Sequence, residues 1–551
     1  MTEQSYDYII VGGGSAGCTL ANRLSADPDT KVLLLEAGPK DRTWKIHMPA
    51  ALTYNLADDK YNWYYETEAQ SGMDQRRMYW PRGRVLGGSS SLNAMVYVRG
   101  HALDYDGWAA QGLPGWSYAD VLPYFRKAET WQNGDNDYRG GDGPLNVSRQ
   151  LTPNPLFNAF IDAGQQAGYP KTQDMNGFQQ EGVGWMDMTI HKGRRWSAAT
   201  AYLKPAMHRS NLTVETRALA TKIVFEGTRA VAIEYDQRGI PHQVRAEREI
   251  ILCGGAINSP QLLMLSGLGP ADHLQEHDIP VVADLSGVGQ NLQDHLELYV
   301  QYECTKPITL YSSTKPWNQV MIGAEWFMFN TGLGASAHLE AGGFIRSEPG
   351  IEHPNLQYHF LPSVVWDHGR IMPDRHAFQA HIGPMRPTSV GDLRLQSADP
   401  RQHPLIQPNY LTTEQDRREM RDAVKLTREI FSQAAFEPYR GKEMAPGEGI
   451  TTNDQIDAFV RQKSDSAYHP SCTCKMGVDE MSVVDGQTRV HGMDNLRIVD
   501  ASIMPNIVSG NLNAPTIMMA EKAADMILGN PALAQAKAPV FASKNWQVSQ
   551  R

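Results

Sequence analysis

The type of fold is indicated by residues 6–38, YDYIIVGGGSAGCTLANRLSADPDTKVLLLEAG. An apolar run of strand type over residues 6–11 ends at three glycines, and a helical pattern over residues 15–25 follows it. A second strand of the buried type lies at residues 32–35. A strand, a tight glycine turn, a helix and a strand within about 30 residues predict a βαβ unit, and therefore a parallel sheet.

The glycine turn has the spacing of a dinucleotide-binding site. In Gly12-x-Gly14-x-x-Gly17, the first glycine permits a sharp turn, the second lets the backbone approach a pyrophosphate, and the third lets helix and strand pack closely. Glu36 ends the second strand, where a carboxylate binds the 2′-hydroxyl of an adenosine ribose. These residues predict dinucleotide binding but do not distinguish FAD from NAD.

Length and composition are those of a large globular protein. At 551 residues the chain exceeds what one hydrophobic core usually supports, so we expect two domains or one large domain with an insertion. Hydrophobic residues make up 41% and charged residues 20% of the chain, and its formal net charge is −10. Nothing in this balance favours a nucleic-acid partner.

The cysteine count indicates a reducing compartment, and the apolar segments are too short for a membrane span. Five cysteines are dispersed along the chain, an odd number that is not typical of a disulfide framework. No window reaches the roughly 18 uninterrupted apolar residues of a membrane span. The folded pattern begins at Tyr6 and leaves no room for a signal peptide. We expect a cytoplasmic protein, and peripheral contact with the inner membrane is left open.

Later segments return to the same strand and helix patterns. Residues 249–253 and 496–500 are of strand type, and residues 513–529 form a helical pattern with Pro515 in its first turn. Between them, residues 355–360 and 392–396 alternate like antiparallel strands. We predict an α/β (α+β) fold with a discontinuous, Rossmann-like dinucleotide-binding domain and an antiparallel-sheet substrate domain. The predicted segments are 1–155, 195–300 and 460–535 for the first domain, 156–194 and 301–459 for the second, and 536–551 for a C-terminal tail.

Three further motifs identify a family. They are GRVLGGSSSLN at 83–93, GAINSP at 255–260 followed by SGLG at 266–269, and a C-terminal set of YHP at 468–470, VDAS at 499–502 and NLNAPT at 511–516. Together they resemble the signatures of the glucose–methanol–choline oxidoreductases, in the family order and over nearly the whole chain. The resemblance implies that the dinucleotide is FAD.

The resemblance also implies where FAD binds. The loop of Gly87, Gly88 and Ser89 is expected to approach the flavin and the pyrophosphate with its amides. The backbone near Ala220 is expected to meet the adenine, and Asp500 and Ala501 the flavin ring. The other implied contacts are Ser15, Ala16, Ala37, Trp63, Arg84, Asn93, Ala94, Met95, Val96, Cys253, Gly254, Asn513, Pro515 and Thr516.

One departure concerns the attachment of FAD. Some members of the family attach FAD covalently through a histidine two residues after the paired serines of this loop. Leu92 stands at that position here, and a leucine side chain cannot form the bond. We expect non-covalent FAD.

Alcohol oxidation needs a hydride acceptor and a group that takes the hydroxyl proton. His469 stands at the catalytic position of the family, and histidine suits the task because its pKa lies near neutral pH. The second catalytic position is expected to be Asn513, whose amide would orient the alcohol because it cannot act as a base. Cys472 and Cys474 form a C-x-C pair, but no second pair accompanies it, so we expect no metal.

The middle of the chain indicates the alcohol. The stretches QYEC at 301–304, GASAHLEAGGFIR at 334–346 and QYHFLP at 357–362 resemble the choline-oxidising members of the family. A quaternary ammonium has no hydrogen-bond donors, so aromatic faces and a carboxylate must hold it. We expect Tyr468 and His359 in the pocket and Glu340 as the carboxylate, with Glu297 and Glu325 as alternatives.

The resemblance therefore implies oxidation of choline to betaine aldehyde, with hydride transfer to FAD and with electrons passed to a quinone rather than to O₂. Another primary-alcohol dehydrogenase of the same family, acting on medium-chain alcohols, is the main alternative. A lyase or binding protein that holds a flavin without redox turnover is a remote one, because the catalytic and flavin motifs are complete.

Overall fold

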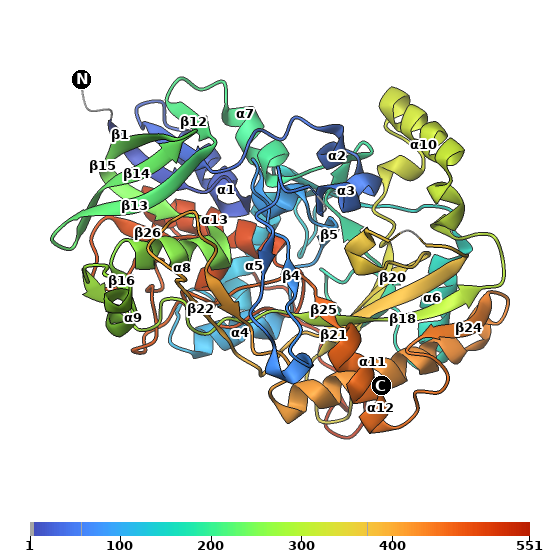
Figure 1. Ribbon diagram of the computed structural model, residues 1–551. Coiled ribbons are helices and arrows are strands. Elements are labelled where there is room, and N and C mark those ends of the chain that lie inside the picture. The colour runs from blue at the N-terminus through green and yellow to red at the C-terminus, as the bar shows by residue number, and fades with distance from the viewer. Residues whose placement is uncertain (1–4, 57, 372) are drawn as a thin grey trace.

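The first sheet has a parallel core, as the opening stretch predicts (Figure 1). The computed structural model describes residues 5–56, 58–371 and 373–551. In spatial order, the parallel strands are β12 (Leu212–Thr216), β2 (Val32–Glu36), β1 (Ser5–Val11), β15 (Ile240–Leu252) and β26 (Leu496–Ile498). The residues of β2 are all buried, which explains its uninterrupted apolar sequence.

Helices and a meander flank this core. Helix α1 (Ser15–Leu24) follows the glycine turn and packs against α13 (Asn513–Leu528), which in turn contacts α5 (Tyr118–Ala128). The first part of β15 extends beyond the parallel core and pairs with β14 (Arg229–Gln237), which pairs with β13 (Ala218–Glu226), both antiparallel. The helices predicted at 15–25 and 513–529 are thus both present.

The second sheet is antiparallel throughout its main path. Its order is β24 (Arg440–Ala445), β18 (Leu296–Cys304), β21 (Ala377–Pro384), β20 (Leu356–Leu361), β19 (Ala341–Ile345) and β8 (Gly182–Trp185). Helices α6 (Pro155–Gln166) and α11 (Glu414–Ser432) pack on it. Buried phenylalanine rings fill the space between them: Phe160 stacks on Phe360 with centroids 5.0 Å apart, and Phe378 stacks on Phe436 at 5.1 Å.

The α/β fold class is confirmed, and two details differ from expectation. The predicted domain boundary at residue 300 falls inside β18, whose pairing with β21 includes Leu298. The strand expected at 392–396 is present as β22 (Asp392–Arg394), but it pairs with β23 (Leu405–Gln407) in a separate sheet. The first difference follows from a pairing partner that is distant in sequence, whereas β22 pairs locally with the next strand.

The remaining α-helices and β-strands lie outside the main paths of these two sheets. They are α2 (Trp44–His47), α3 (Leu52–Leu56), α4 (Ala102–Ala110), α7 (Lys204–Ala206), α8 (Gly255–Leu265), α9 (Ala271–Glu276), α10 (Pro316–Phe329), α12 (Asn453–Lys463), β3 (Tyr65–Glu66), β4 (Tyr79–Trp80), β5 (Val96–Tyr97), β6 (Glu129–Trp131), β7 (Leu145–Arg149), β9 (Asp187–Met188), β10 (Ile190–His191), β11 (Arg194–Arg195), β16 (Leu268–Gly269), β17 (Ala283–Asp284) and β25 (Asp465–Ser466). Among the residues described, no helix is both long and apolar enough to cross a bilayer.

Candidate active site

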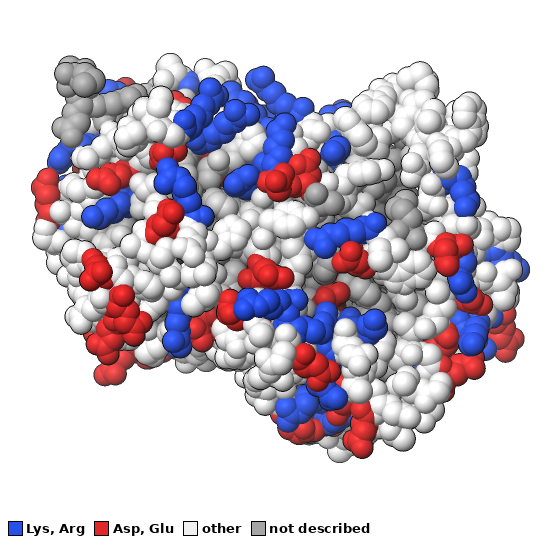
Figure 2. Space-filling view, in the orientation of Figure 1, with Lys and Arg blue, Asp and Glu red and all other residues white. Residues whose placement is uncertain are grey.

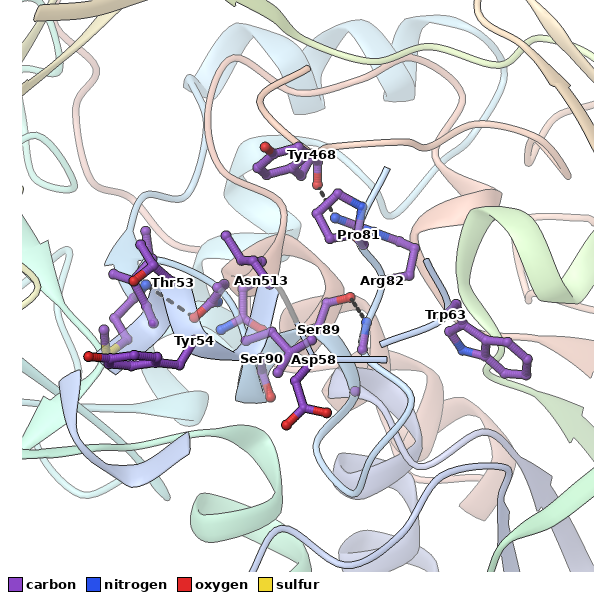
Figure 3. Close-up of a pocket in the computed structure, with 18 of the residues that line it drawn as sticks. Thr53, Tyr54, Asp58, Trp63, Pro81, Arg82, Ser89, Ser90, Tyr468 and Asn513 are labelled. Atoms are coloured by element: carbon purple, nitrogen blue, oxygen red, sulfur yellow. Dashed lines mark hydrogen bonds between the residues drawn. The ribbon is translucent and has the colours of Figure 1, made fainter. Parts of the chain in front are cut away.

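A cavity of about 1620 Å³ reaches from the dinucleotide turn to His469. Its walls come from both sheets, with Gly12 and Glu36 at one end and Tyr468 and His469 at the other. Figure 3 shows part of this wall: Ser89, Ser90 and Asn513 lie together near its centre. Pockets for drug-sized ligands are about 300–1,000 Å³, so this space suits a large cofactor together with a substrate.

Three backbone segments meet at the glycine turn without room for a side chain. Gly12 has φ +107°, and a Cβ atom there would lie 2.5 Å from the carbonyl oxygen of Cys253. A Cβ atom on Gly88 would lie 2.7 Å from the Cα atom of Gly14. The amide of Gly87 donates to the carbonyl of Gly13 at 2.7 Å. The loop of the second motif is therefore fixed directly against the turn of the first.

Two helix N-termini face the cavity beside this contact. Helices α1 and α13 begin next to each other, and the hydroxyl of Ser15 donates to Oδ1 of Asn513 at 2.8 Å. Both residues line the cavity. The unpaired amides at a helix N-terminus attract negative charge, so two of them together suit a pyrophosphate.

Glu36 lies at the end of β2, as expected for a ribose contact. Its carboxylate accepts the amides of Gly13 at 2.9 Å and Gly38 at 2.7 Å, and it lines the cavity. Burial raises the pKa of Glu36 to about 7, although the two amides act in the opposite direction. Each carboxylate oxygen still has a second lone pair with which to accept a hydroxyl.

Most residues predicted to bind the cofactor line the cavity. The exceptions are Gly17, Arg84, Gly87 and Pro515. Gly17 lies behind the turn, where a Cβ atom would be 1.9 Å from the carbonyl oxygen of Gly12, so its role there is close packing. The Arg84 guanidinium lies over the ring of Trp63 at 5.5 Å, and Trp63 is the member of this pair that faces the cavity.

A buried carboxylate fixes the backbone of His469. Oδ1 of Asp294 accepts the amide of His469 at 2.6 Å, and Oδ2 accepts the hydroxyls of Ser466 at 2.5 Å and of Tyr410. Arg82 donates to the carbonyl of Tyr468 at 2.5 Å, a contact drawn in Figure 3. The residue before the histidine, Tyr468, has φ +65°, a conformation that needs such support.

The hydrogen bonds of two histidines fix the proton on His469. Nε2 of His295 lies 3.0 Å from the carbonyl oxygen of Met385, which can only accept, so this nitrogen carries a hydrogen. Burial lowers the pKa of His295 to about 4, so the ring is neutral and its Nδ1 is bare. That atom lies 3.0 Å from Nδ1 of His469, which must therefore donate.

His469 is thereby left with a bare Nε2. Burial lowers the pKa of His469 well below its ordinary value, and the nearby His295 and Arg82 act in the same direction. The ring is consequently neutral at neutral pH, with its hydrogen on Nδ1 and a lone pair on Nε2. Because His469 lines the cavity, this arrangement supplies a base that is ready to accept a proton.

The amide that contacts this base is not the predicted one. Nδ2 of Asn511 lies 3.2 Å from Nε2 of His469, whereas Asn513 is two residues further on and bonded to Ser15. Oδ1 of Asn511 accepts from Gln357 at 3.0 Å, which orients the amide so that its nitrogen faces the histidine. Both asparagines stand in the same NLN motif, and only their placement separates them.

The predicted carboxylate, Glu340, lies outside the cavity wall. It is completely buried, and its oxygens accept the amide of Thr152 at 2.7 Å and the hydroxyls of Thr152 and Ser336. Both carboxylate oxygens of Glu340 therefore accept hydrogen bonds from the protein itself. Glu325 on α10 is exposed and also lies outside the wall, whereas the third candidate, Glu297, belongs to it.

Glu297 stands in an aromatic environment. Its Oε1 accepts from the Tyr299 hydroxyl at 3.2 Å and lies 3.2 Å from Nδ1 of His381. Burial alone would raise the pKa of Glu297, but His381 and His359 lower it below its ordinary value. The carboxylate is therefore ionised, and it lines the cavity together with Tyr299, the predicted Tyr468 and the predicted His359.

A sequence signal for Glu297 exists. Alternate residues of a strand point to the same side, and His295, Glu297 and Tyr299 alternate with Leu296 and Leu298 at the start of β18. A row of polar side chains opposite a buried leucine row indicates that one side of the strand faces a polar site. Asn511 has no comparable signal, because its role depends on a loop.

Known proteins share this architecture. Family models described as "GMC oxidoreductase" match residues 6–297 and 387–520. Choline dehydrogenase, mitochondrial, of Homo sapiens is 63% identical over 98% of this chain and 92% of its own length. An oxygen-dependent choline dehydrogenase of Pseudomonas syringae pv. tomato is 56% identical over 98% and 96%. The crystal structure of pyridoxine 4-oxidase from Mesorbium loti covers 96% of this chain and all of its own, with 34% identity and a TM-score of 0.88.

The residues present fit the cofactor of that family. The close-packed glycines leave room for a pyrophosphate, and the helix N-termini complement its charge. Glu36 lines the cavity where it can accept a hydrogen bond from a ribose hydroxyl. This chain therefore belongs to the GMC oxidoreductase family, and its cofactor is FAD.

Proposed function

We propose that this chain oxidises choline to betaine aldehyde, the first step of glycine betaine synthesis. The observation that carries the proposal is one cavity that joins an ionised Glu297, two tyrosines and the bare Nε2 of His469. The names of the human and Pseudomonas relatives support the choice of choline.

The cavity suits the ammonium group of choline. A quaternary ammonium offers no hydrogen for a hydrogen bond, so it is bound by charge and by the faces of aromatic rings. The Glu297 carboxylate supplies the charge, and Tyr299 and Tyr468 supply the rings. Glu297 replaces Glu340 in this role, because the carboxylate of Glu340 is bonded outside the cavity.

The proton of the hydroxyl goes to His469 in this proposal. Its Nε2 accepts the hydroxyl proton, while the amide nitrogen of Asn511 donates to the substrate oxygen and stabilises the charge that develops there. Bound FAD supplies the acceptor for the hydride that leaves the carbinol carbon. Asn513, held by Ser15, lies at the start of α13 on the cofactor side of the cavity.

For the electrons, we propose a membrane quinone as acceptor, with the protein in the cytoplasm and in peripheral contact with the inner membrane. The name of the Pseudomonas relative, which is called oxygen-dependent, favours O₂ as a second candidate. Both acceptors would take the two electrons that choline loses on becoming an aldehyde. Hydrogen peroxide forms only with O₂, so the two candidates are separable.

The charge of the substrate provides the main test. Choline and 3,3-dimethylbutan-1-ol have almost the same shape, but only choline is cationic. The charge should contribute roughly 2 kcal/mol, which corresponds to about a 30-fold preference for choline in kcat/KM. A pocket built for medium-chain alcohols would show the reverse, because an unpaired buried ammonium is costly. Equal or faster oxidation of the neutral analogue would overturn the proposal.

Replacing Glu297 should reduce this preference. Glu297→Gln keeps the shape of the side chain but removes its charge, so we expect the choline preference to fall at least tenfold while oxidation of the neutral analogue changes little. Glu325→Gln is the matched control, because Glu325 is exposed and outside the cavity wall. The same preference in both variants would mean that another group binds the ammonium.

Replacing His469 should abolish turnover while FAD stays bound. His469→Gln is expected to lower kcat by at least ~10², the lower range for loss of a general base, whereas the exposed His208→Gln is expected to change nothing. The neutral base is present above its pKa and is lost as pH falls through it. Since that pKa is lowered, wild-type kcat/KM should stay level from pH 8 to pH 7 and decline only below about pH 6.5.

The bound FAD should be released by acid. Leu92 is buried at the cavity wall and offers no nitrogen for a covalent bond to the flavin. After acid precipitation of the holoenzyme and centrifugation, we expect the yellow colour in the supernatant. A yellow pellet that survives washing would contradict non-covalent binding.

The acceptor can be identified by turnover under two atmospheres. We expect choline oxidation to proceed without oxygen when a short-chain ubiquinone is supplied, and to produce little hydrogen peroxide in air. Peroxide formed in equal amount to betaine aldehyde would show that O₂ is the acceptor and would reject the quinone.

A further inference from the structure

Helix α10 exposes an unusual amount of apolar surface. Trp317 is 72% exposed, Met321 54% and Met328 65%, and within the helix only Trp326 is buried. The helix stands away from both sheets at the upper right of Figure 1, and the same region is free of charged colour over most of its surface in Figure 2. Large contiguous apolar patches on soluble proteins mark sites of contact with proteins or membranes.

The helix has two apolar faces with different surroundings. Pro316, Val320, Gly323 and Phe327 follow one another at helical spacing and line the cavity. Trp317, Met321 and Met328 lie about 100° further round the helix, which is one residue's rotation, and none of them lines the cavity. One row of residues on the helix thus borders the cavity, and the neighbouring row forms an exposed apolar surface.

Aromatic rings extend this surface toward α2 and α3. The ring of Trp44, which is 41% exposed, meets Phe327 at 5.8 Å and Tyr54 at 6.0 Å. Trp44, Tyr54 and Phe327 are all cavity-lining residues as well. Tryptophan and tyrosine are enriched where a protein meets the headgroup region of a bilayer.

Basic side chains surround the helix. Lys315 precedes its first residue and lies 4.1 Å above the ring of Tyr311, whereas Lys45, next to Trp44, is paired with Asp58 at 3.7 Å. At the other end, Arg194 lies over the ring of Trp326 at 5.1 Å, beside the exposed Lys192. The one acidic residue within α10 is Glu325. An apolar helix bordered by cations is complementary to an anionic lipid surface.

We propose that α10 docks this protein on an anionic lipid surface, with Trp317, Met321 and Met328 inserted among the headgroups. The helix lies along the surface rather than across it. The cavity-lining residues of α10 then lie next to the lipid surface. An apolar molecule dissolved in the membrane can therefore enter the cavity past this helix without crossing water. Docking through α10 does not depend on which alcohol is oxidised. Its benefit to the enzyme does rest on the proposed function, in which a lipid-soluble quinone accepts the electrons.

A second copy of the chain is the main competitor for this surface. Residues that line the cavity, such as Val320 and Phe327, are 60% and 59% exposed, so they form its rim. A second protein bound to the helix would cover this rim. A fluid lipid surface would instead leave the rim accessible to molecules that are dissolved in the lipid. The basic residues on both sides also favour an anionic partner over an identical, equally basic surface.

Vesicle flotation tests the docking directly. The FAD-loaded protein is mixed with vesicles of phosphatidylcholine alone or with a quarter of phosphatidylglycerol, and the floated fraction is measured. We expect wild-type protein to float with the anionic vesicles. The variant W317S/M321S/M328S should float at least tenfold less, and K192E/K315E should lose the preference for anionic over neutral vesicles.

The matched control removes equally exposed side chains elsewhere. V478S/M481S/V548S alters residues that are 72%, 41% and 81% exposed and lie outside α10, so it should float like the wild type. Choline oxidation with a soluble dye and no vesicles should be the same in all of these proteins, because none of the residues lines the cavity. Failure of that reaction in the wild type would reject the proposed function and leave the flotation result intact.

Three results would overturn the docking proposal. The first is wild-type protein that fails to float with either vesicle, and the second is a W317S/M321S/M328S variant that floats as well as the wild type. The third is light scattering that shows a wild-type dimer and a W317S/M321S/M328S monomer without vesicle binding, which would assign the helix to a second copy of the chain.

Discussion

The contact between the backbones of Gly14 and Gly88 holds the cofactor end of the cavity together. A Cβ atom on Gly88 would lie only 2.7 Å from the Cα atom of Gly14, so the loop of Gly88 cannot carry a side chain where it crosses the turn. Gly12 approaches Cys253 equally closely, so β1, the 83–93 loop and the end of β15 are fixed to one another. The starts of α1 and α13, and with them the Ser15–Asn513 bond, depend on this arrangement.

At the catalytic end of the cavity, the hydrogen bonds fix which ring nitrogen of His469 carries the proton. The carbonyl of Met385 sets the tautomer of His295, and His295 sets the tautomer of His469. Asp294, the neighbour of His295, holds the backbone of His469. The consecutive residues Asp294 and His295 therefore control both the position and the protonation of His469. The histidine needs no reorganisation before it accepts a proton.

The parts that the sequence predicted are those encoded locally. A glycine turn after a strand, a carboxylate at the end of the next strand and the position of His469 depend on short motifs with a physical reason for each residue. Glu297 and Asn511 depend instead on contacts between segments far apart in the chain. The alternation of polar residues in β18 favours Glu297 but does not exclude Glu340. Their placement separates them: the first faces the cavity, and the second is bonded to Thr152 and Ser336 outside it.

The order of the strands has a consequence for synthesis of the protein. The hydrogen bond between Ser15 and Asn513 spans 498 residues, and β26 joins the parallel core only after residue 496 has been made. At roughly 5–20 residues per second, the N-terminal βαβ unit waits on the order of half a minute or longer for these partners. The strands β1 and β2 are paired earlier by β15 and β12, but the edge of β15 at Ile250–Leu252 stays unpaired until β26 is made. Chaperones therefore have a longer opportunity to act on the nascent chain than the compact native fold suggests.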